Sequence, residues 1–135
     1  MDSVSRKKRS EIMALVRSKN TRPELAVRKL VFSLGYRYRL HRKDLPGCPD
    51  LVFKKRGKVI FVHGCFWHRH KNCPLARLPK SRLGFWKSKL EGNERRDRKN
   101  KLALMRKGWK VLTVWECQVK DSKRLGEKIG RFLDA

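Results

Sequence analysis

The segment HGCFWHRHKNCP, residues 63 to 74, concentrates side chains that bind metals. It holds three histidines and two cysteines in twelve positions. Cys65, His70 and Cys73 have the short spacing of a tetrahedral zinc site, because thiolate sulfur and imidazole nitrogen are ligands that zinc prefers in proteins. His68 is an alternative to His70 as the nitrogen ligand. The competing interpretation is that these cysteines are ordinary buried thiols.

The fourth zinc ligand must come from outside this segment. Cys117 is favoured because it directly follows an apolar stretch, residues 109 to 115, that is typical of a strand, and strand ends bring distant segments together. Cys48 is the other candidate. A site filled by three cysteines and one histidine is closed, so its role would be structural. Zinc binding of this kind is worth roughly 10–16 kcal/mol, enough to offset much charge repulsion.

A second pattern is Pro49-Asp50, followed eleven residues later by Phe61-Val62-His63. The residues between them predict a hairpin with an acidic group where it begins and a polar group where it ends. This arrangement resembles the active-site hairpin of restriction-endonuclease-like folds, in which the aspartate holds Mg²⁺ against the scissile phosphate. Those enzymes usually place an acid and a lysine on the second strand, where Val62 and His63 stand here. A plain turn around Asp50 is the alternative.

The chain is strongly basic. Over 135 residues, 37 Lys and Arg oppose 12 Asp and Glu, which gives a formal charge of +25. Such a charge destabilises a compact chain by self-repulsion, so a polyanionic partner is expected, with nucleic acid favoured over an anionic membrane surface. No apolar run approaches the roughly 20 residues of a membrane span, and the N-terminus, MDSVSRKKRS, lacks the apolar core of a signal peptide. We therefore expect one intracellular domain in a reducing compartment.

Apolar periodicity predicts the elements that position these groups. Helices are expected from Thr21 to about residue 34, from 82 to 107 with a break or cap near Gly92, and at the C-terminus, where Leu125, Ile129, Phe132 and Leu133 form an apolar stripe. Strands are expected at residues 36 to 40, 50 to 53, 58 to 62 and 109 to 115. The order strand, helix, strand predicts a parallel crossover. The predicted fold is therefore α/β, a mixed central sheet flanked by helices.

Four stretches, LPGCPDLVF, VIFVHGCFWH, FWKSKLEGNERRD and GWKVLTVWEC, resemble the very-short-patch-repair DNA mismatch endonucleases of bacteria. The resemblance runs from about Arg9 to Cys117. It implies a restriction-endonuclease-like catalytic domain at residues 21–135 with an added structural zinc, preceded by a basic DNA-contacting segment at residues 1–20. The family nicks DNA 5′ of the thymine in T:G mismatches that arise from 5-methylcytosine deamination.

The resemblance also implies the surroundings of this activity. The expected partner is double-stranded DNA with a T:G mismatch, bound by a monomer, with further contacts to other mismatch-repair or excision-repair proteins. The expected location is the bacterial cytoplasm, associated with the nucleoid. The bases that flank the mismatch are not predicted, because base readout depends on side-chain geometry.

The same resemblance gives roles to individual residues. Asp50 matches the Mg²⁺-binding aspartate, with the backbone carbonyl of Val62 as second ligand. His68 matches the general base that activates the attacking water, and Asp97 the acid that orients it. His63 and Glu24 match the family's residues that hold metal-bound water or the phosphate. The zinc ligands of the family are matched by Cys65, His70, Cys73 and Cys117.

The adjacent aromatics Phe66 and Trp67 match a pair that the family inserts between base pairs at the mismatch. A methionine of the N-terminal segment enters from the other groove, and Met13 is the matching position. An apolar wedge unstacks bases at a cost of about a few kcal/mol, less where pairing is already faulty. The alternative is a core role, which is awkward because a loop cannot easily bury both neighbours in the same direction.

Each catalytic assignment has a simpler alternative. Glu24 completes a capping box with Thr21, Asp97 could be a solvated helix charge, and His68 a spare zinc ligand. For the whole chain, one alternative is a non-catalytic, zinc-stabilised DNA-binding module, and another is a restriction nuclease of the same fold. The joint presence of Asp50, His63, His68 and Asp97 argues against the non-catalytic module.

Overall fold

The computed structural model describes residues 21–135 as a mixed α/β domain. The predicted segment of residues 1–20, with Met13, lies outside the described residues. The helices are α2 (Arg22–Ser33), α3 (Leu83–Arg106) and α4 (Ser122–Asp134), and the strands are β1 (Arg39–Leu40), β2 (Leu51–Phe53), β3 (Lys58–His63) and β4 (Lys110–Trp115). Short 3-10 turns lie at Lys54–Arg56, Pro74–Ala76 and Glu116–Lys120.

The four strands form one sheet in the order β1-β2-β3-β4. β2 pairs antiparallel with β1 and with β3, as the predicted hairpin requires. β3 and β4 are parallel, with His63 opposite Trp115, and α3 connects them. The predicted mixed sheet and parallel crossover are thus confirmed. Because β3 and β4 run the same way, the segments that follow His63 and Trp115 emerge at the same edge of the sheet.

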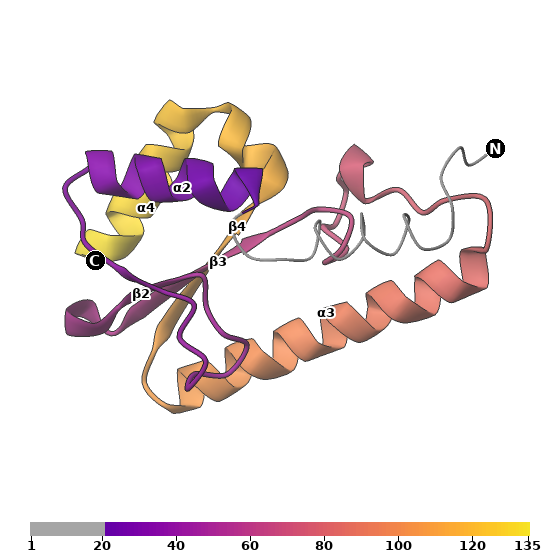
Figure 1. The fold of residues 1–135 in the computed structure, drawn as a ribbon, viewed down its shortest axis with the longest axis horizontal. Helices are drawn as coiled ribbons and strands as arrows, with labels where there is room; N and C mark the ends of the chain where they lie inside the picture. Colours follow the sequence, from indigo (N-terminus) through magenta and orange to yellow (C-terminus); the bar gives the residue numbers. More distant parts are fainter. Residues whose placement is uncertain (1–20) are drawn as a thin grey trace.

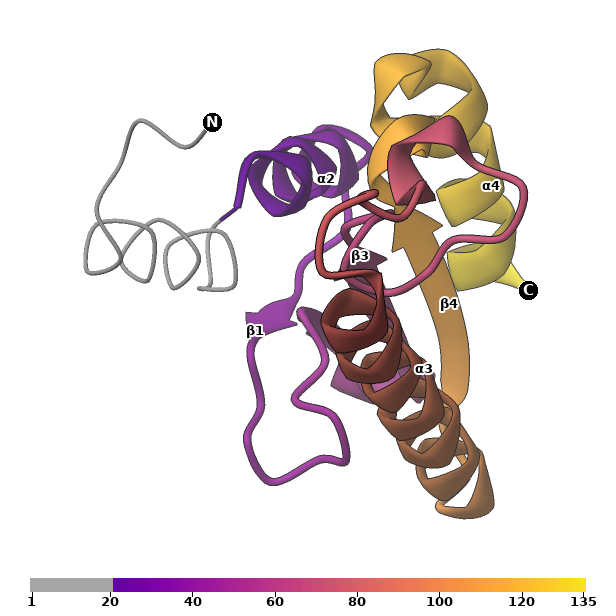
Figure 2. The same cartoon turned by 90° about the vertical axis from the view of Figure 1, so that its right-hand side faces the viewer.

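Helices cover both faces of the sheet, with α2 and α4 on one side and α3 on the other (Figures 1 and 2). The strand residues Leu51, Phe53 and Ile60 pack with buried side chains of α2 and α4. Their neighbours Val52, Val59 and Phe61 pack with Leu104 of α3 on the opposite face. This alternation follows from the period of two in a strand, and it leaves β3 buried on both faces, as predicted.

α2 begins and ends where its sequence predicts. The Thr21 hydroxyl accepts a hydrogen bond from the Glu24 backbone N–H at 3.4 Å, and a proline occupies the first turn. The chain leaves the helix through Gly35 at φ 95°, a left-handed conformation that glycine adopts without steric cost. This cap fixes the first turn of α2, and with it Glu24, beside the sheet.

Two predicted boundaries were wrong. α3 is one continuous helix of 24 residues through Gly92, because a lone glycine costs only about 1 kcal/mol relative to alanine. The strand expected at residues 36 to 40 is reduced to Arg39–Leu40, both exposed. Tyr36 and Tyr38 pack against the core beside α2 instead, and the Tyr38 hydroxyl donates to the Arg28 carbonyl at 3.3 Å.

Within residues 21–135, no helix has the combination of length and apolar composition that crossing a bilayer requires.

Candidate active site and metal centre

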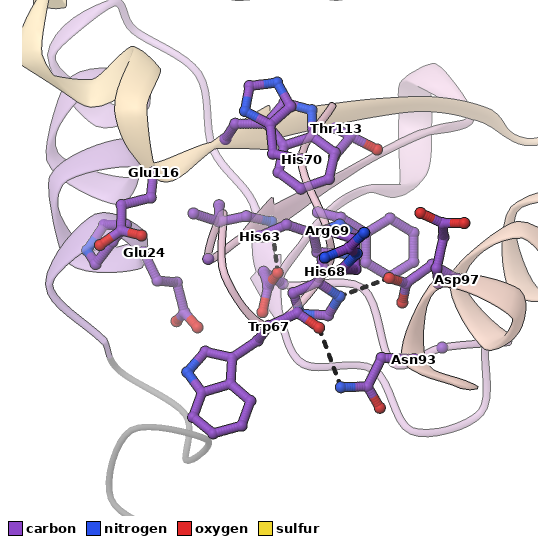
Figure 3. A pocket seen from close by; sticks show the side chains of 18 of the residues that line it. Glu24, His63, Trp67, His68, Arg69, His70, Asn93, Asp97, Thr113 and Glu116 are labelled. Carbon is purple, nitrogen blue, oxygen red and sulfur yellow. Dashed lines mark hydrogen bonds and ion pairs between the residues drawn. The ribbon is translucent and has the colours of Figure 1, made fainter. Parts of the chain in front are cut away.

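A cleft of about 1260 Å³ opens where α2, the turn before β2, the end of β3 and the middle of α3 meet. The sequence-predicted groups Glu24, Asp50, His63, His68 and Asp97 all line it. In Figure 3, Glu24 reaches the cleft from α2, His68 from the loop after β3 and Asp97 from α3. The structure therefore brings together residues that the chain separates by more than seventy positions.

His68 and Asp97 form a close pair. The Nδ1 atom of His68 lies 2.6 Å from Oδ2 of Asp97, which projects from α3 (Figure 3). Asp97 is therefore not simply a solvated helix charge. A carboxylate that accepts a hydrogen bond from Nδ1–H fixes the tautomer in which Nε2 carries a lone pair. In this geometry the Nε2 atom of His68 can accept a proton.

His63 supports the ring of His68. The two imidazoles are stacked, with ring centroids 3.9 Å apart and an angle of 7° between their planes. Burial, and secondarily the neighbouring His68, lowers the pKa of His63 to about 3. His63 is therefore neutral at physiological pH and packs in the cleft as an uncharged ring, against His68 and Trp115.

Asp50 is fixed at the start of β2, next to the end of β3. Its Oδ2 accepts a hydrogen bond from the Val62 backbone N–H at 2.7 Å. The turn that precedes it places Gly47, at φ 76°, so close to Asn100 of α3 that an added Cβ would lie 3.0 Å from that side chain. The pKa of Asp50 is raised to about 7, chiefly by burial and also by the nearby carboxylate of Glu24, against the opposing effects of the Val62 hydrogen bond and the Arg28 charge.

The carboxylate of Glu24 points into the cleft. It forms an ion pair with Arg28 and lies 2.9 Å from Nε2 of His41. Thr21 caps the backbone N–H of Glu24, so the capping role and the cleft role use different atoms of the residue. The sequence interpretation missed His41. Its only signal in the sequence was a polar residue directly after a predicted strand. The structure places it opposite Asp50 in the sheet.

The raised pKa of Asp50 predicts how stability depends on pH in protein free of added divalent cations. The folded state favours the neutral carboxyl, so its stabilising contribution is full below the ordinary pKa of 3.8 and is lost as pH rises through about 7. Asp50→Asn should therefore melt above wild type by an increment that grows from pH 5 to pH 7 and then levels off. Each 1 kcal/mol gained corresponds to roughly 3–5 °C.

Thermal melting across this pH range tests the prediction. Asp44→Asn is the matched control, because Asp44 lies in the same loop but is exposed and paired with Arg42. A constant gap in melting temperature between wild type and Asp50→Asn at all pH values would contradict the raised pKa of Asp50.

A second cluster lies beside the cleft, where the ends of β3 and β4 meet. Its ligand atoms lie within 4.8 Å of one another, and its members are Cys65, His70, Cys73 and Cys117. Nδ1 of His70 is 3.6 Å from the sulfur of Cys65 and 3.5 Å from that of Cys117. The structure thus groups His70 and Cys117 with Cys65 and Cys73, and it leaves His68 and Cys48 outside this cluster.

The local fold explains why these four residues meet. The loop after β3 turns back at once, with the His70 N–H donating to the Cys65 carbonyl at 3.0 Å. Cys117 arrives on the turn that follows β4, and the His70 ring stacks on Trp115, with centroids 4.2 Å apart. Burial raises the pKa of the Cys65 thiol to about 12, so a thiolate at this position requires a cation. Three sulfurs and one imidazole suit a tetrahedral zinc ion.

Phe66 and Trp67 lie together with a third aromatic residue, Trp86 of α3. The ring centroids are 5.1 Å apart for Phe66 and Trp67, and 5.6 and 5.9 Å from each of them to Trp86. All three side chains are half-buried, and none belongs to the two core clusters. Asn93 of α3 donates to the Trp67 carbonyl at 3.0 Å and so holds the loop (Figure 3). Trp86 and Asn93 were not assigned roles from the sequence.

Comparison with known proteins agrees with this geometry. The family model described as DNA mismatch endonuclease Vsr matches residues 1–74. The type II nicking enzyme V.XorIIP of Xanthomonas oryzae pv. oryzae is 53% identical over 133 residues, which cover 98% of this chain and 97% of the relative. The DNA mismatch endonuclease Vsr of Escherichia coli is 38% identical over 120 residues, 89% of this chain and 76% of the relative. By these similarities, the chain belongs to the Vsr family of DNA mismatch endonucleases.

Proposed function

We propose that this chain is a strand-specific endonuclease that nicks DNA 5′ of the thymine in T:G mismatches produced by deamination of 5-methylcytosine, and so starts very short patch repair. The observation that carries the proposal is the His68–Asp97 pair at 2.6 Å in the cleft that also holds Asp50. A general base and a cation-binding carboxylate in one cleft are the groups that phosphodiester hydrolysis needs.

The residues of the cleft have separate tasks in the reaction. Nε2 of His68 takes a proton from water as the water oxygen attacks phosphorus and the P–O bond to the leaving oxygen breaks. The carboxylate of Asp97 stabilises the imidazolium that forms. A Mg²⁺ ion, when bound, supplies positive charge to the scissile phosphate.

Asp50 and the backbone carbonyl of Val62 are the proposed ligands of that Mg²⁺. The N–H and C=O of a strand residue point to the same side of the strand. Because the Val62 N–H donates to Asp50, the Val62 carbonyl faces the same side, next to the Asp50 carboxylate. Glu24 and His63 border this place and are proposed to hold water or the phosphate.

Zinc is the proposed occupant of the Cys65, His70, Cys73 and Cys117 cluster, in a structural role. The β2–β3 hairpin that carries Asp50 supports the proposal of a restriction-endonuclease-like fold for residues 21–135, with residues 1–20 as a DNA-contacting segment. The chain is proposed to act as a monomer on mismatched duplex DNA, in the bacterial cytoplasm at the nucleoid, where other repair proteins are further partners.

The decisive experiment compares nicking of duplexes that differ only in one pair, T:G against T:A, with each strand labelled separately. The proposal predicts one nick, 5′ of the mismatched thymine, in the T:G duplex alone. Cleavage of the matched duplex would indicate a restriction nuclease, and binding without cleavage of either duplex would indicate a non-catalytic DNA-binding module.

The aromatic pair should act as a wedge at the mismatch. We expect Phe66→Ala and Trp67→Ala to keep the fold and the bound zinc but to lose T:G binding by about 10-fold or more, since base–aromatic stacking is worth roughly 1–3 kcal/mol per base. The rings are half-buried and contact one another and Trp86 instead of the core. Met13→Ala should weaken binding less severely.

Thermal melting, zinc content and T:G affinity, measured on the same preparations, check this prediction. Phe32→Ala is a suitable control, because Phe32 is 56% exposed on α2 and does not line the cleft. If the aromatic variants melt early or lose zinc before DNA is added, the pair is a structural core and not a wedge.

A further inference from the structure

His41, directly after β1, has no part in the mechanism proposed above, yet one of its ring nitrogens faces two carboxylates of the cleft. Nε2 lies 2.9 Å from Oε2 of Glu24 and 3.8 Å from Oδ1 of Asp50. Ligand atoms of these three residues all lie within 4.8 Å of one another. The imidazole is therefore close enough to Asp50 to share a cation with it.

The backbone around His41 holds the ring in this place. The His41 N–H donates to the Asp50 carbonyl at 3.3 Å, which extends the pairing of β1 with β2 by one residue. The residue has φ 47°, in the left-handed region that costs a non-glycine residue roughly 1–2 kcal/mol. Its side chain is only 12% exposed. A strained and largely buried conformation persists where the surroundings determine it, and such residues gather at ligand sites.

The charges around His41 leave room for a divalent cation. Arg28 forms an ion pair with Glu24, and its guanidinium lies 3.5 Å from Nε2 of His41. Arg28 also acts on Asp50, because its charge opposes the rise of the Asp50 pKa. One arginine beside two carboxyl groups still leaves one formal negative charge in this group, which a divalent cation would balance.

We propose that Nε2 of His41 is a direct ligand of the divalent cation bound by Asp50, and that this nitrogen makes the site bind Mn²⁺ much more tightly than Mg²⁺. The inference rests on the proposed function, because it takes Asp50 as the cation-binding carboxylate. Mg²⁺ prefers oxygen ligands in an octahedron, whereas imidazole raises the affinity for first-row transition metals. A site of oxygens alone would lack this source of preference.

Ligation changes the hydrogen bonding of the ring. Without a cation, Nε2–H donates to Glu24 at 2.9 Å. With the cation bound, the proton resides on Nδ1, and the Nε2 lone pair faces the metal. His41→Gln removes the nitrogen ligand but keeps a polar side chain that can still hydrogen-bond to Glu24, so it separates ligation from a purely structural role.

The test is Mn²⁺ binding to the intact, zinc-containing chain, followed by electron paramagnetic resonance, with Mg²⁺ affinity obtained by competition. We expect His41→Gln to weaken Mn²⁺ binding about 10-fold or more and Mg²⁺ binding by less than about 3-fold, in line with the loss of one ligand. Spin-echo spectra of bound Mn²⁺ should show coupling to a directly bound nitrogen, and this coupling should disappear in the variant.

Two further variants complete the test. Lys43→Gln is the control: it removes a full charge from the same loop and should leave both affinities unchanged, since Lys43 is exposed. His41→Asn is a second test of the ligand and should weaken Mn²⁺ binding as His41→Gln does, because asparagine tolerates the left-handed backbone better than glutamine.

The inference would be overturned if His41→Gln weakened Mn²⁺ binding and Mg²⁺ binding equally, or if the Mn²⁺–nitrogen coupling persisted in this variant. Its failure is distinguishable from failure of the proposed function, because the binding measurements use no DNA. A chain that does not nick T:G duplex could still show the selectivity, and a mismatch endonuclease could lack it.

Discussion

Asp50→Ala and His68→Ala are each expected to abolish nicking of a T:G duplex while affinity for that duplex stays within about 3-fold of wild type. A positioned general base contributes typically 10²–10⁴-fold to a rate, and loss of the cation removes charge stabilisation of several kcal/mol in the transition state. Both groups act on the transition state more than on ground-state binding. Single-turnover nicking rates and equilibrium binding, measured with the same DNA, test this expectation.

The His68–Asp97 pair adds a sharper form of the prediction. Asp97→Asn retains the shape of the side chain but can turn its amide N–H₂ toward Nδ1, which would shift the His68 proton to Nε2 and remove the lone pair that accepts from water. We therefore expect a loss comparable to that of His68→Ala, and no additional loss in the double variant. Near wild-type turnover in Asp50→Ala would contradict the proposed cation site. If the losses of rate in His68→Ala and Asp97→Asn multiplied in the double variant, the two residues would not act as one unit.

Much of the fold could be predicted from local sequence signals. The cap at Thr21, the proline in the first turn and Gly35 define α2 without reference to the rest of the chain. The hairpin and the parallel crossover followed from the order of apolar runs. The errors arose where tertiary contacts decide: Tyr36 and Tyr38 pack beside α2 instead of extending β1, and α3 passes Gly92 unbroken.

The candidate site likewise contains residues that could be predicted from the sequence and residues that could not. The pairing of His68 with Asp97 was expected through family resemblance, since the residues around Asp97 give no chemical signal by themselves. The position of His41 between Glu24 and Asp50 could not be predicted, because it depends on the register of β1 with β2 and on the angle of α2. Trp86 was missed for the same reason: its contact with Phe66 joins α3 to a loop twenty residues earlier.

The proposed zinc cluster of Cys65, His70, Cys73 and Cys117 carries the largest expected effect on stability. As a zinc ligand, Cys117 would tie the turn after β4 to the loop after β3, so its loss would release the loop that carries Phe66, Trp67 and His68. Structural zinc sites contribute apparent binding energies of roughly 10–16 kcal/mol, which is comparable to the whole stability of a typical domain, about 5–15 kcal/mol. We therefore expect Cys117→Ser to give a protein that loses zinc and is unfolded or insoluble at physiological temperature.

Cys48→Ser is the matched control for this prediction, since Cys48 is a half-buried cysteine outside the cluster. It should keep one equivalent of zinc per chain and melt within a few degrees of wild type, because it exchanges one small side chain for another. Zinc content by elemental analysis and thermal melting, measured for both variants, decide the assignment. If Cys48→Ser lost the metal and Cys117→Ser kept it, the fourth ligand would be Cys48, and the contact between the ends of β3 and β4 would not depend on zinc.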